Sequence, residues 1–338
     1  MKVGVVPQHG RLELLDMSEP NPGPYDCLVK IDAAAICTGT DSNIIAGTFP
    51  WLTATPFVLG HESTGIVLEI GAKVHNIRKG QRVTRAAAVF PADRRDGIGS
   101  NWGAFAELGM VRDHAAAKAD GATVAGTQAL TVLADDVDPV SAALSVNQRE
   151  ILSVTHNFKL GPQSRVVVIG SGYNGLLFSL YSKHYGAGRV VMVGSGGREK
   201  LSTATFEADA FVDYHAPGAV SRAERALGGK PTDLIDAVGT VASLTLAKQL
   251  LGPDTAFGRY GLHEYHAIGP LTDELQKGHR ALPMGTDEVG MTDEWYRMWK
   301  GGFFDREGIY DATMPLADIV RAFERLKHRE ATKLVLIM

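Results

Sequence analysis

Gly170-Ser171-Gly172-Tyr173-Asn174-Gly175 follows the apolar run Val166-Val167-Val168-Ile169 and precedes a helix-compatible segment at residues 176–185. In such a hexamer the first glycine permits a tight strand-to-helix turn, the second lets a pyrophosphate approach the backbone, and the third lets the helix pack on the sheet. The helix N-terminus then offers N–H groups and a positive dipole end to the phosphates. The context predicts a dinucleotide site rather than an ordinary turn, with these cofactor-binding residues: Gly170, Gly172, Tyr173, Asn174 and Gly175.

The next expected strand, residues 189–193, ends in Gly194-Ser195-Gly196-Gly197-Arg198 and not in an acidic residue. In NAD sites a carboxylate here binds the adenosine ribose hydroxyls, and it would repel a 2′-phosphate. This segment instead leaves space and supplies positive charge for a 2′-phosphate, which would contact Ser195, Gly196 and Arg198. An Arg side chain suits bidentate contact with phosphate. The pattern predicts a preference for NADP(H) over NAD(H). The alternative is that Arg198 and Lys200 only begin a solvated helix.

Further expected strands at residues 210–213, 233–239 and 256–262 alternate with helix-like segments. This alternation predicts an α/β domain with a doubly wound parallel sheet. The N-terminal part of the chain differs, because short alternating strands are expected at residues 28–34, 63–70, 81–86 and 104–110, separated by Gly and Pro. That pattern is typical of a mainly β domain.

Length and charge favour an enzyme that acts on a small molecule. The 338 residues exceed what one core normally holds, which predicts two domains. A net charge of −4 and a pI near 6.3 argue against nucleic acid or an anionic membrane as the main partner. No apolar run reaches transmembrane length and the N-terminus lacks a signal-peptide core, so we expect a cytoplasmic location and no membrane partner.

The chain has two cysteines, Cys27 and Cys37, which exclude a disulfide framework and a structural zinc site of four cysteines. Cys27 alternates with apolar residues on one strand face and is expected in the core. Cys37 and Gly60-His61-Glu62 offer a thiolate, an imidazole and a carboxylate, which zinc accepts in a catalytic site. The alternatives are that Cys37 is a buried small hydrophobe and His61 a core histidine.

In their order along the chain, these motifs resemble those of the medium-chain dehydrogenase/reductase family of zinc alcohol, polyol and sugar dehydrogenases. The resemblance covers nearly the whole chain and is carried by the glycine hexamer and by residues 37–41, 60–62, 103–107, 236–239 and 331–336. It implies a GroES-like β-barrel catalytic domain at residues 1–146 and 285–338, and a Rossmann domain at residues 147–284. It also implies that Val238 and Gly239 bind the cofactor and that the protein is a homo-oligomer, a dimer or tetramer.

The resemblance further implies zinc-dependent hydride transfer between NADP(H) and a secondary alcohol or ketone, such as a polyol, sugar or cyclitol. Cys37 and His61 match zinc ligands, and Glu62 matches a direct or exchangeable third ligand of one catalytic zinc, with no structural zinc. Two residues, not the usual one, separate Cys37 from the Thr-Asp pair. The proton-relay hydroxyl is therefore that of Thr40 or Thr38, and Asp41 would orient a ligand.

Many polyol dehydrogenases of this family carry a Glu near zinc in the helix before the Rossmann domain. Counting without gaps places Val146 there, with Glu150 one helical turn later on the same face. Glu150 is thus either a fourth ligand or a solvated carboxylate. Segments that border the substrate cleft in the family contain three aromatic residues, which either stack on a substrate ring or belong to the core: Phe49, Trp51 and Trp102.

Two other functions compete with this interpretation. A zinc-independent quinone or enone reductase of the same superfamily would generally lack the Cys37 and Gly-His-Glu set that this chain retains. The irregular segment after Cys37 and the unassigned fourth zinc ligand would fit a non-catalytic NADPH-binding protein. The retained residues of the kind that bind a metal do not fit such a protein.

Overall fold

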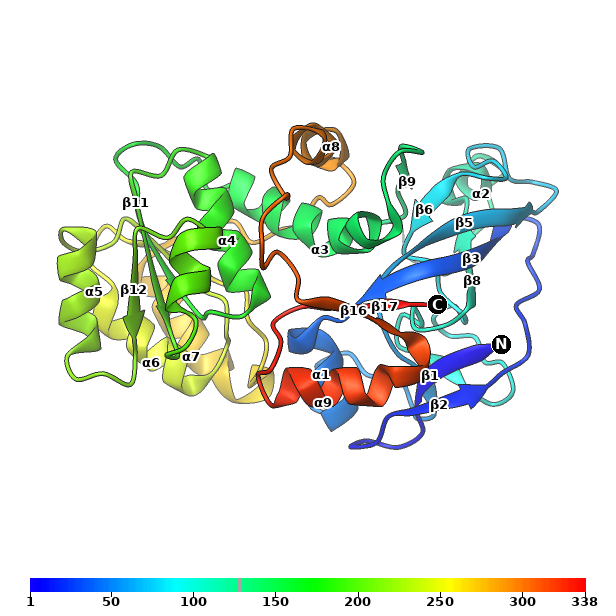
Figure 1. Cartoon of the computed structure of the whole chain (residues 1–338), viewed down its shortest axis with the longest axis horizontal. Coiled ribbons are helices and arrows are strands. Elements are labelled where there is room, and N and C mark those ends of the chain that lie inside the picture. The colour runs from blue at the N-terminus through cyan, green and yellow to red at the C-terminus, as the bar shows by residue number, and fades with distance from the viewer. Residues whose placement is uncertain (127–128) are drawn as a thin grey trace. The chain divides into compact units, whose positions relative to one another are not determined.

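The computed structural model describes residues 1–126 and 129–338, and the chain divides into two compact units (Figure 1). The first unit comprises Met1–Asn147 and Tyr310–Met338, and the second comprises Gln148–Ile309. The chain therefore returns to the first unit at Tyr310, whereas the sequence places this return near residue 285. Within the described residues, no helix is both long enough and apolar enough to cross a membrane.

Buried polar contacts explain why residues 285–309 belong to the second unit. Arg149 is fully buried and donates to the Glu288 carboxylate at 3.0 Å. Trp295, also fully buried, donates from its indole nitrogen to Gln148 at 2.8 Å. Because breaking a buried ion pair costs about 3–5 kcal/mol, these contacts hold the segment against the helix that carries Arg149.

The second unit contains a parallel sheet in the order β12-β11-β10-β13-β14-β15. Its strands are β10 (Arg165–Ile169), β11 (Arg189–Gly194), β12 (Ala210–Asp213), β13 (Asp233–Asp236), β14 (Ala256–Arg259) and β15 (Arg280–Ala281). The order reverses beside β10, and ligands of such sheets bind at the carboxyl ends of the strands at this point. The doubly wound sheet is therefore confirmed, although β13 and β14 end three residues earlier than expected.

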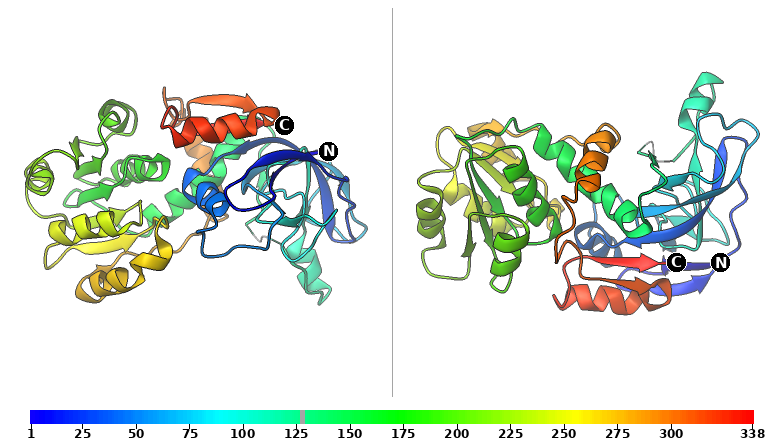
Figure 2. Two further views of the ribbon diagram at one scale, coloured as in Figure 1. Left: turned by 90° about the horizontal axis from the view of Figure 1, so that it is seen from below. Right: turned by 45° about the horizontal axis from the view of Figure 1, so that its top comes forward.

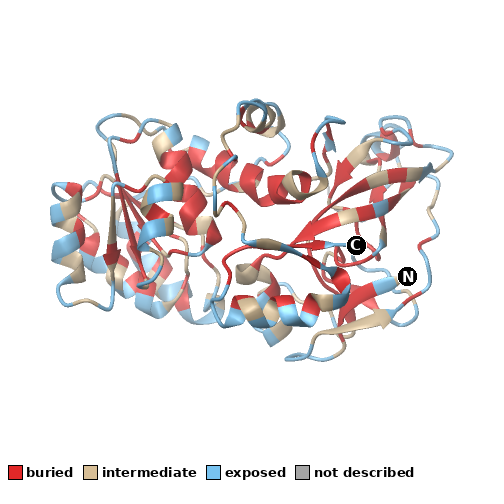
Figure 3. Ribbon diagram, viewed as in Figure 1, coloured by how far each residue is buried: buried red, intermediate tan, exposed pale blue. Residues whose placement is uncertain are grey.

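Helices cover both faces of this sheet (Figure 2). They are α4 (Tyr173–His184), the short π-helix η1 (Leu201–Thr205), α5 (Ala219–Leu227), α6 (Val241–Leu250) and α7 (Tyr265–Gly278), whereas α8 (Thr292–Lys300) lies against the helix that carries Gln148. Apolar residues of α5, α6 and α7 share one core cluster with β10, β11 and β13. Strands β10, β11, β13 and β14 are buried along most of their length, in red in Figure 3, which explains their largely apolar runs.

The first unit contains two sheets, in the orders β16-β17-β3-β5-β6-β9 and β2-β1-β4-β7, with β8 paired to β3. Their strands are β1 (Lys2–Val6), β2 (Glu13–Asp16), β3 (Asp26–Ala35), β4 (Phe57–Val58), β5 (Glu62–Ile70), β6 (Arg82–Thr84), β7 (Gly99–Ser100), β8 (Leu108–Arg112), β9 (Val132–Leu133), β16 (Ala312–Pro315) and β17 (Leu334–Ile337). The expected mainly β domain is thus present. Cys27 lies in its core, as expected, and burial raises the pKa of its thiol to about 12.

Short helices connect these strands: α1 (Thr38–Ala46), α2 (His114–Ala119), η2 (Leu316–Asp318) and α9 (Ile319–Lys327). The longer α3 (Pro139–His156) contains the boundary between the units, after Asn147. Asp113 caps α2 by accepting from the Ala116 backbone N–H at 3.0 Å. The same carboxylate accepts from the backbone of His75 and Asn76, so it ties a loop to the helix start.

Candidate active site

Strand pairing in the first unit brings together Cys37, His61 and Glu62, whose side chains can bind a metal. Ala35, near the end of β3, pairs with Glu62 at the start of antiparallel β5. Cys37 lies two residues beyond the end of β3 and His61 directly precedes β5, so the two residues lie at the same end of the strand pair. On the other side of β3, Val335 of β17 pairs with Ala35, which brings Lys333 to this end as well.

Cys37, His61 and Glu62 form a compact group. One ligand atom from each residue lies within 4.8 Å of the others, and the His61 Nε2 to Glu62 Oε1 distance is 3.8 Å. Glu62 is 1% exposed and its Oε1 has no hydrogen-bond partner among the described residues. Leaving a buried carboxylate oxygen unpaired is costly, and a cation at this point would satisfy it.

The second carboxylate oxygen of Glu62 has a charged partner. Lys333, which is 2% exposed, donates from Nζ to Glu62 Oε2 at 2.6 Å. The ammonium fixes the carboxylate so that only Oε1 faces the cysteine and histidine. Sequence reasoning noted residues 331–336 as a motif but missed this role, because the β3–β17 pairing that brings Lys333 to Glu62 is visible only in the folded structure.

Asp41 contacts two residues of the group, Cys37 and His61, and orients them. It is fully buried, accepts from the Cys37 backbone N–H at 2.9 Å, and places Oδ1 3.2 Å from His61 Nδ1. Burial alone would lower the pKa of His61, but the Asp41 carboxylate and the Cys37 side chain together outweigh burial and raise that pKa well above its usual value. With Nδ1 facing Asp41, the imidazole presents Nε2 to Cys37 and Glu62.

Thr38 and Thr40 both lie in the first turn of α1, which begins directly after Cys37. Side chains two positions apart on a helix do not face each other. One of these hydroxyls at most can therefore face a substrate at the group, and both are partly exposed.

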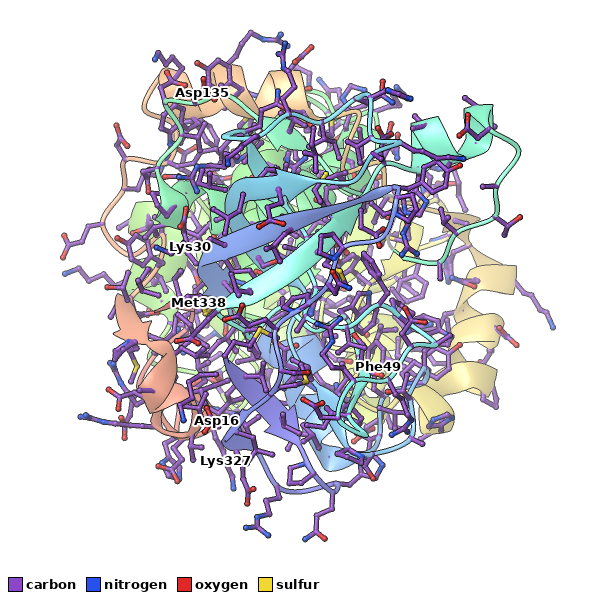
Figure 4. The ribbon with its side chains drawn as sticks, turned by 90° about the vertical axis from the view of Figure 1, so that its right-hand side faces the viewer. Asp16, Lys30, Phe49, Asp135, Lys327 and Met338 are labelled. Atoms are coloured by element: carbon purple, nitrogen blue, oxygen red, sulfur yellow. The ribbon has the colours of Figure 1, made fainter. Side chains whose placement is uncertain are left out.

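A row of neighbouring aromatic rings extends from His61. The Trp102 ring lies 5.4 Å from the His61 ring, and Phe49, labelled in Figure 4, lies edge-on to Trp102 at 5.7 Å and to Trp51 at 5.5 Å. Phe49 is buried, whereas Trp51 is 63% exposed, the highest value among the exposed large apolar residues. The three aromatics that the sequence proposed for the substrate thus form one array that starts at His61.

A cavity of about 180 Å³ adjoins the same histidine. Its lining includes His61, Trp102, Phe90 and Arg85. Arg85 donates from Nη1 to the His61 carbonyl at 3.2 Å. The sequence analysis did not select Arg85, because it expected a continuous strand over residues 81–86; β6 ends at Thr84 instead.

Glu150 lies in the second unit, on α3, and is not part of the cluster found among the described residues. Its Oε1 accepts a hydrogen bond from the Tyr260 hydroxyl at 2.5 Å. Tyr260 follows β14, so this contact joins the helix to the carboxyl end of the parallel sheet. Whether Glu150 also binds a metal stays a prediction.

The glycine hexamer has the geometry that its sequence predicts. Gly170 has φ +110°, and a Cβ on Gly175 would lie 2.0 Å from the Gly170 carbonyl oxygen, so no other residue fits. Gly172 precedes α4 without a capping side chain, which leaves the N–H groups of Tyr173 and Asn174 at an uncapped helix start. The arrangement suits a pyrophosphate.

Val238 and Gly239 lie beside this turn. A Cβ on Gly170 would meet Val238 Cγ2 at 2.6 Å, and Gly239 has φ +76°. The Asp236 carboxylate accepts from the backbone N–H of both residues, at 3.0 Å for Val238 and 3.2 Å for Gly239. The loop after β13 is thereby fixed against the first glycine of the hexamer.

The loop after β11 contains Ser195, Gly196 and Arg198, but it also has an acidic neighbour. A Cβ on Gly196 would lie 2.6 Å from Asp213 Oδ2, because Gly194 of β11 and Asp213 of β12 are paired in register. Sequence reasoning missed Asp213. The signal was available, since the carboxyl ends of adjacent parallel strands meet at one edge of the sheet.

Comparison with known proteins matches both units. Residues 23–123 match the model of the alcohol dehydrogenase GroES-like domain, which confirms the expected fold of the first unit. An alcohol dehydrogenase of Cupriavidus necator is 29% identical over 297 residues, covering 80% of this chain and 79% of the relative.

Two further comparisons extend this result. An NADP-dependent isopropanol dehydrogenase of Entamoeba histolytica is 26% identical over 272 residues, covering 74% of this chain and 69% of the relative. The crystal structure of benzyl alcohol dehydrogenase from Acinetobacter calcoaceticus superimposes with a TM-score of 0.81 at 18% identity, covering 100% of this chain and 99% of that chain. This structural likeness shows that the fold is shared along the whole chain.

Proposed function

Because the chain belongs to the medium-chain dehydrogenase/reductase family, we propose that it is a zinc-dependent oxidoreductase that transfers a hydride between NADP(H) and a secondary alcohol or ketone. The observation that carries the proposal is the buried group of Cys37, His61 and Glu62, with an unpaired carboxylate oxygen directed into it. A zinc-independent reductase would have no use for such a group.

The donor atoms fit zinc. A thiolate, an imidazole nitrogen and a carboxylate oxygen are three protein ligands of the kind found in catalytic zinc sites, which keep a fourth position for water or substrate. A zinc ion held by these three residues would supply Lewis-acid chemistry that lowers the pKa of the substrate hydroxyl. The two cysteines are far too few for a structural site of four thiolates, so we propose one zinc per chain.

The chain's own residues prepare the site. Asp41 keeps the His61 ring in one orientation, and Lys333 keeps one oxygen of Glu62 occupied. A hydroxyl in the first turn of α1, that of Thr40 or Thr38, would accept the proton of the alcohol and pass it toward solvent.

Glu150 has two possible roles within this proposal. As a fourth ligand it would exchange with water at the metal. As a carboxylate held by Tyr260 it would instead serve the second unit, and the 2.5 Å hydrogen bond supports this second role. The two roles differ in their effect on metal retention.

For the nicotinamide cofactor, the turn of Gly170, Gly172 and Gly175 supports binding of a dinucleotide. Ser195 and Arg198 support NADP(H), as does the relative that is named for its dependence on NADP. Asp213 opposes this preference because its charge has the same sign as a 2′-phosphate.

For the substrate, we propose a polyol, sugar or cyclitol whose ring or chain lies on the array of Phe49, Trp51 and Trp102. Aromatic faces contact the C–H faces of such molecules and exclude water around the reacting carbon. The array supports this class because it starts at the imidazole of His61.

The function is tested by following NADPH oxidation with a panel of ketoses, inososes and simple ketones, before and after chelation. We expect turnover that 1,10-phenanthroline abolishes and that added Zn²⁺ restores. Glu150→Gln is measured in parallel: a drop in kcat of more than about tenfold with loss of metal identifies a ligand, and changes within about twofold identify a carboxylate outside the metal site. Full turnover by metal-free protein would refute the zinc mechanism.

A further inference from the structure

Two separate segments of the chain carry the array of Phe49, Trp51 and Trp102. The first segment connects α1 to β4 and contains Phe49 and Trp51, and the second follows β7 and contains Trp102. Strands β4 and β7 pair in parallel. Because both strands run in the same direction, the first segment enters the pair at one end and the second leaves it at the other. Strand pairing alone therefore does not hold the two segments together.

Asn101 supplies the contact between these segments. Its Oδ1 accepts two hydrogen bonds from Thr53, one from the backbone N–H and one from the hydroxyl, each at 2.9 Å. Asn101 is 4% exposed, and its own backbone N–H donates to the Val58 carbonyl at 2.9 Å. Thr53 lies two positions after Trp51. Asn101 directly precedes Trp102, so this amide joins the outer and inner ends of the array.

The orientation of the Asn101 amide is fixed by its partner and has a cost. A backbone N–H can only donate, so the carbonyl end of the amide must face Thr53. The other end, Nδ2, is buried and has no hydrogen-bond partner among the described residues. An unpaired buried donor costs free energy, and so the contact with Thr53 is kept against a penalty. The next residue, Trp102, has a φ of +68°, and such strained residues cluster at ligand sites.

From these contacts we propose that Asn101 is a positioning residue that fixes Trp51, and that it thereby sets a preference for substrates with a ring beyond the reacting carbon. The inference rests on the proposed function, because it places the reacting carbon at the group that contains His61. The rings follow one another outward from His61, at centroid distances of 5.4, 5.7 and 5.5 Å. A short substrate therefore contacts Trp102, and a longer one also reaches Trp51. Because Trp51 is 63% exposed, a substrate ring would cover apolar surface there.

The test uses two ketones that share the reacting part and differ in a terminal ring, 2-butanone and 4-phenyl-2-butanone. For the zinc-loaded wild type with NADPH, we expect kcat/KM to be at least about tenfold higher for the phenyl ketone, through a lower KM. An enzyme that reduces ketones but does not prefer the one with the ring would overturn the inference and leave the proposed function intact. An enzyme that reduces no ketone would contradict the proposed function itself.

Variants assign the preference to the contact between Asn101 and Thr53. Thr53→Val removes the hydroxyl donor at nearly constant volume and should lower the ratio of kcat/KM for the phenyl ketone over 2-butanone by about fivefold. Asn101→Ala removes both hydrogen bonds and should lower this ratio by more than about tenfold. Thr53→Ser keeps both donors, and Thr313→Val makes the same exchange at an exposed position of β16, so both controls should stay within about twofold.

The variants also separate positioning from general damage. Zinc content is measured for each protein, and the loss should lie in KM for the phenyl ketone. Thr53→Val changes a residue at the edge of the fold, so it tests the contact even where Asn101→Ala does not fold. A Thr53→Val protein that keeps the ratio, or one that loses turnover of both ketones equally, would overturn the assignment.

A spectroscopic measurement follows Trp51 itself. The chain has four tryptophans, so protein labelled with 5-fluorotryptophan gives four ¹⁹F resonances, and Trp51→Phe identifies the resonance of Trp51. We expect Thr53→Val to shift or broaden this resonance and to leave those of Trp295 and Trp299, in the second unit, unchanged. Titration with 4-phenyl-2-butanone should shift the Trp51 resonance of the wild type, with a Kd about fivefold weaker in Thr53→Val. A Trp51 resonance that the variant leaves unchanged, or that the phenyl ketone does not shift, would overturn the inference.

Discussion

Asp213 and Arg198 set opposite charges around the loop after β11. Arg198 follows Gly196 by two residues, and Asp213 Oδ2 lies next to Gly196. A 2′-phosphate in this loop would be attracted by the first residue and repelled by the second. The net cofactor preference is therefore a balance that single substitutions can shift in either direction.

We predict that the wild type prefers NADP(H) over NAD(H) by at least about tenfold in kcat/KM, since charged hydrogen bonds provide about 1.5–3 kcal/mol. Arg198→Ala should reduce this preference, whereas Asp213→Asn should increase it by about fivefold, because removing a like charge near the surface is worth about 1 kcal/mol. Steady-state kinetics with both cofactors measure the preference. Asp254→Asn, which alters an exposed carboxylate elsewhere on the second unit, is the control. Equal use of NADH by the wild type would contradict the prediction.

At the scale of elements, the sequence predicted the parallel sheet well because each of its strands is a short apolar run that ends at a turn. The ends of strands were predicted less well. β6 ends at Thr84 because Arg85 adopts a positive φ, and β13 ends at Asp236 because its carboxylate caps the following backbone. Such local bonds depend on where the neighbouring loop lies, which one sequence does not reveal.

The start of α2 is fixed by one carboxylate. Burial by itself would raise the pKa of Asp113, but hydrogen bonds from the backbone of Ala116, from Asn76 and from His75 outweigh burial and lower that pKa to about 2. The folded-state pKa is thus below the ordinary value of 3.8. The ionised carboxylate therefore stabilises the fold above about pH 4, and this contribution disappears as the pH falls toward 2.

We predict that Asp113→Ala lowers the free energy of unfolding by about 2 kcal/mol at pH 7, because it removes a helix cap and the acceptor of the His75 and Asn76 backbone N–H groups. The difference from wild type should shrink between pH 4 and pH 2. Urea unfolding followed by circular dichroism at several pH values measures both effects. Asp135→Ala, at the exposed carboxylate labelled in Figure 4, should change the unfolding free energy by less than about 0.5 kcal/mol. A difference for Asp113→Ala that is constant with pH would show that its charge is not what stabilises the helix.

At the scale of the whole molecule, the sequence predicted the two-part organisation, and its short motifs selected Cys37, His61 and Glu62, which the structure brings together. It did not predict Lys333, Arg85 or the return of the chain at Tyr310. Lys333 pairs with Glu62 across 271 positions, and Arg149 joins Glu288 across 139. Contacts at such separation follow from strand pairing and burial, which become visible only in the folded structure.

The division into units makes the proposed metal site and the proposed nucleotide site separable. Cys37, His61 and Glu62 belong to the first unit, and the glycine hexamer belongs to the second. A substitution at Cys37 should therefore remove the metal without removing the site for NADPH.

The most direct test is the zinc content of protein purified without chelator, measured by mass spectrometry for the wild type and two cysteine variants. We predict about one zinc per chain in the wild type and in Cys27→Ala, whose substituted thiol lies in the core, and little zinc in Cys37→Ala. NADPH binding, measured by fluorescence titration, should be retained by all three. A wild-type protein without zinc, or a Cys37→Ala protein that keeps a full equivalent, would contradict the central claim that Cys37, His61 and Glu62 form the metal site of this enzyme.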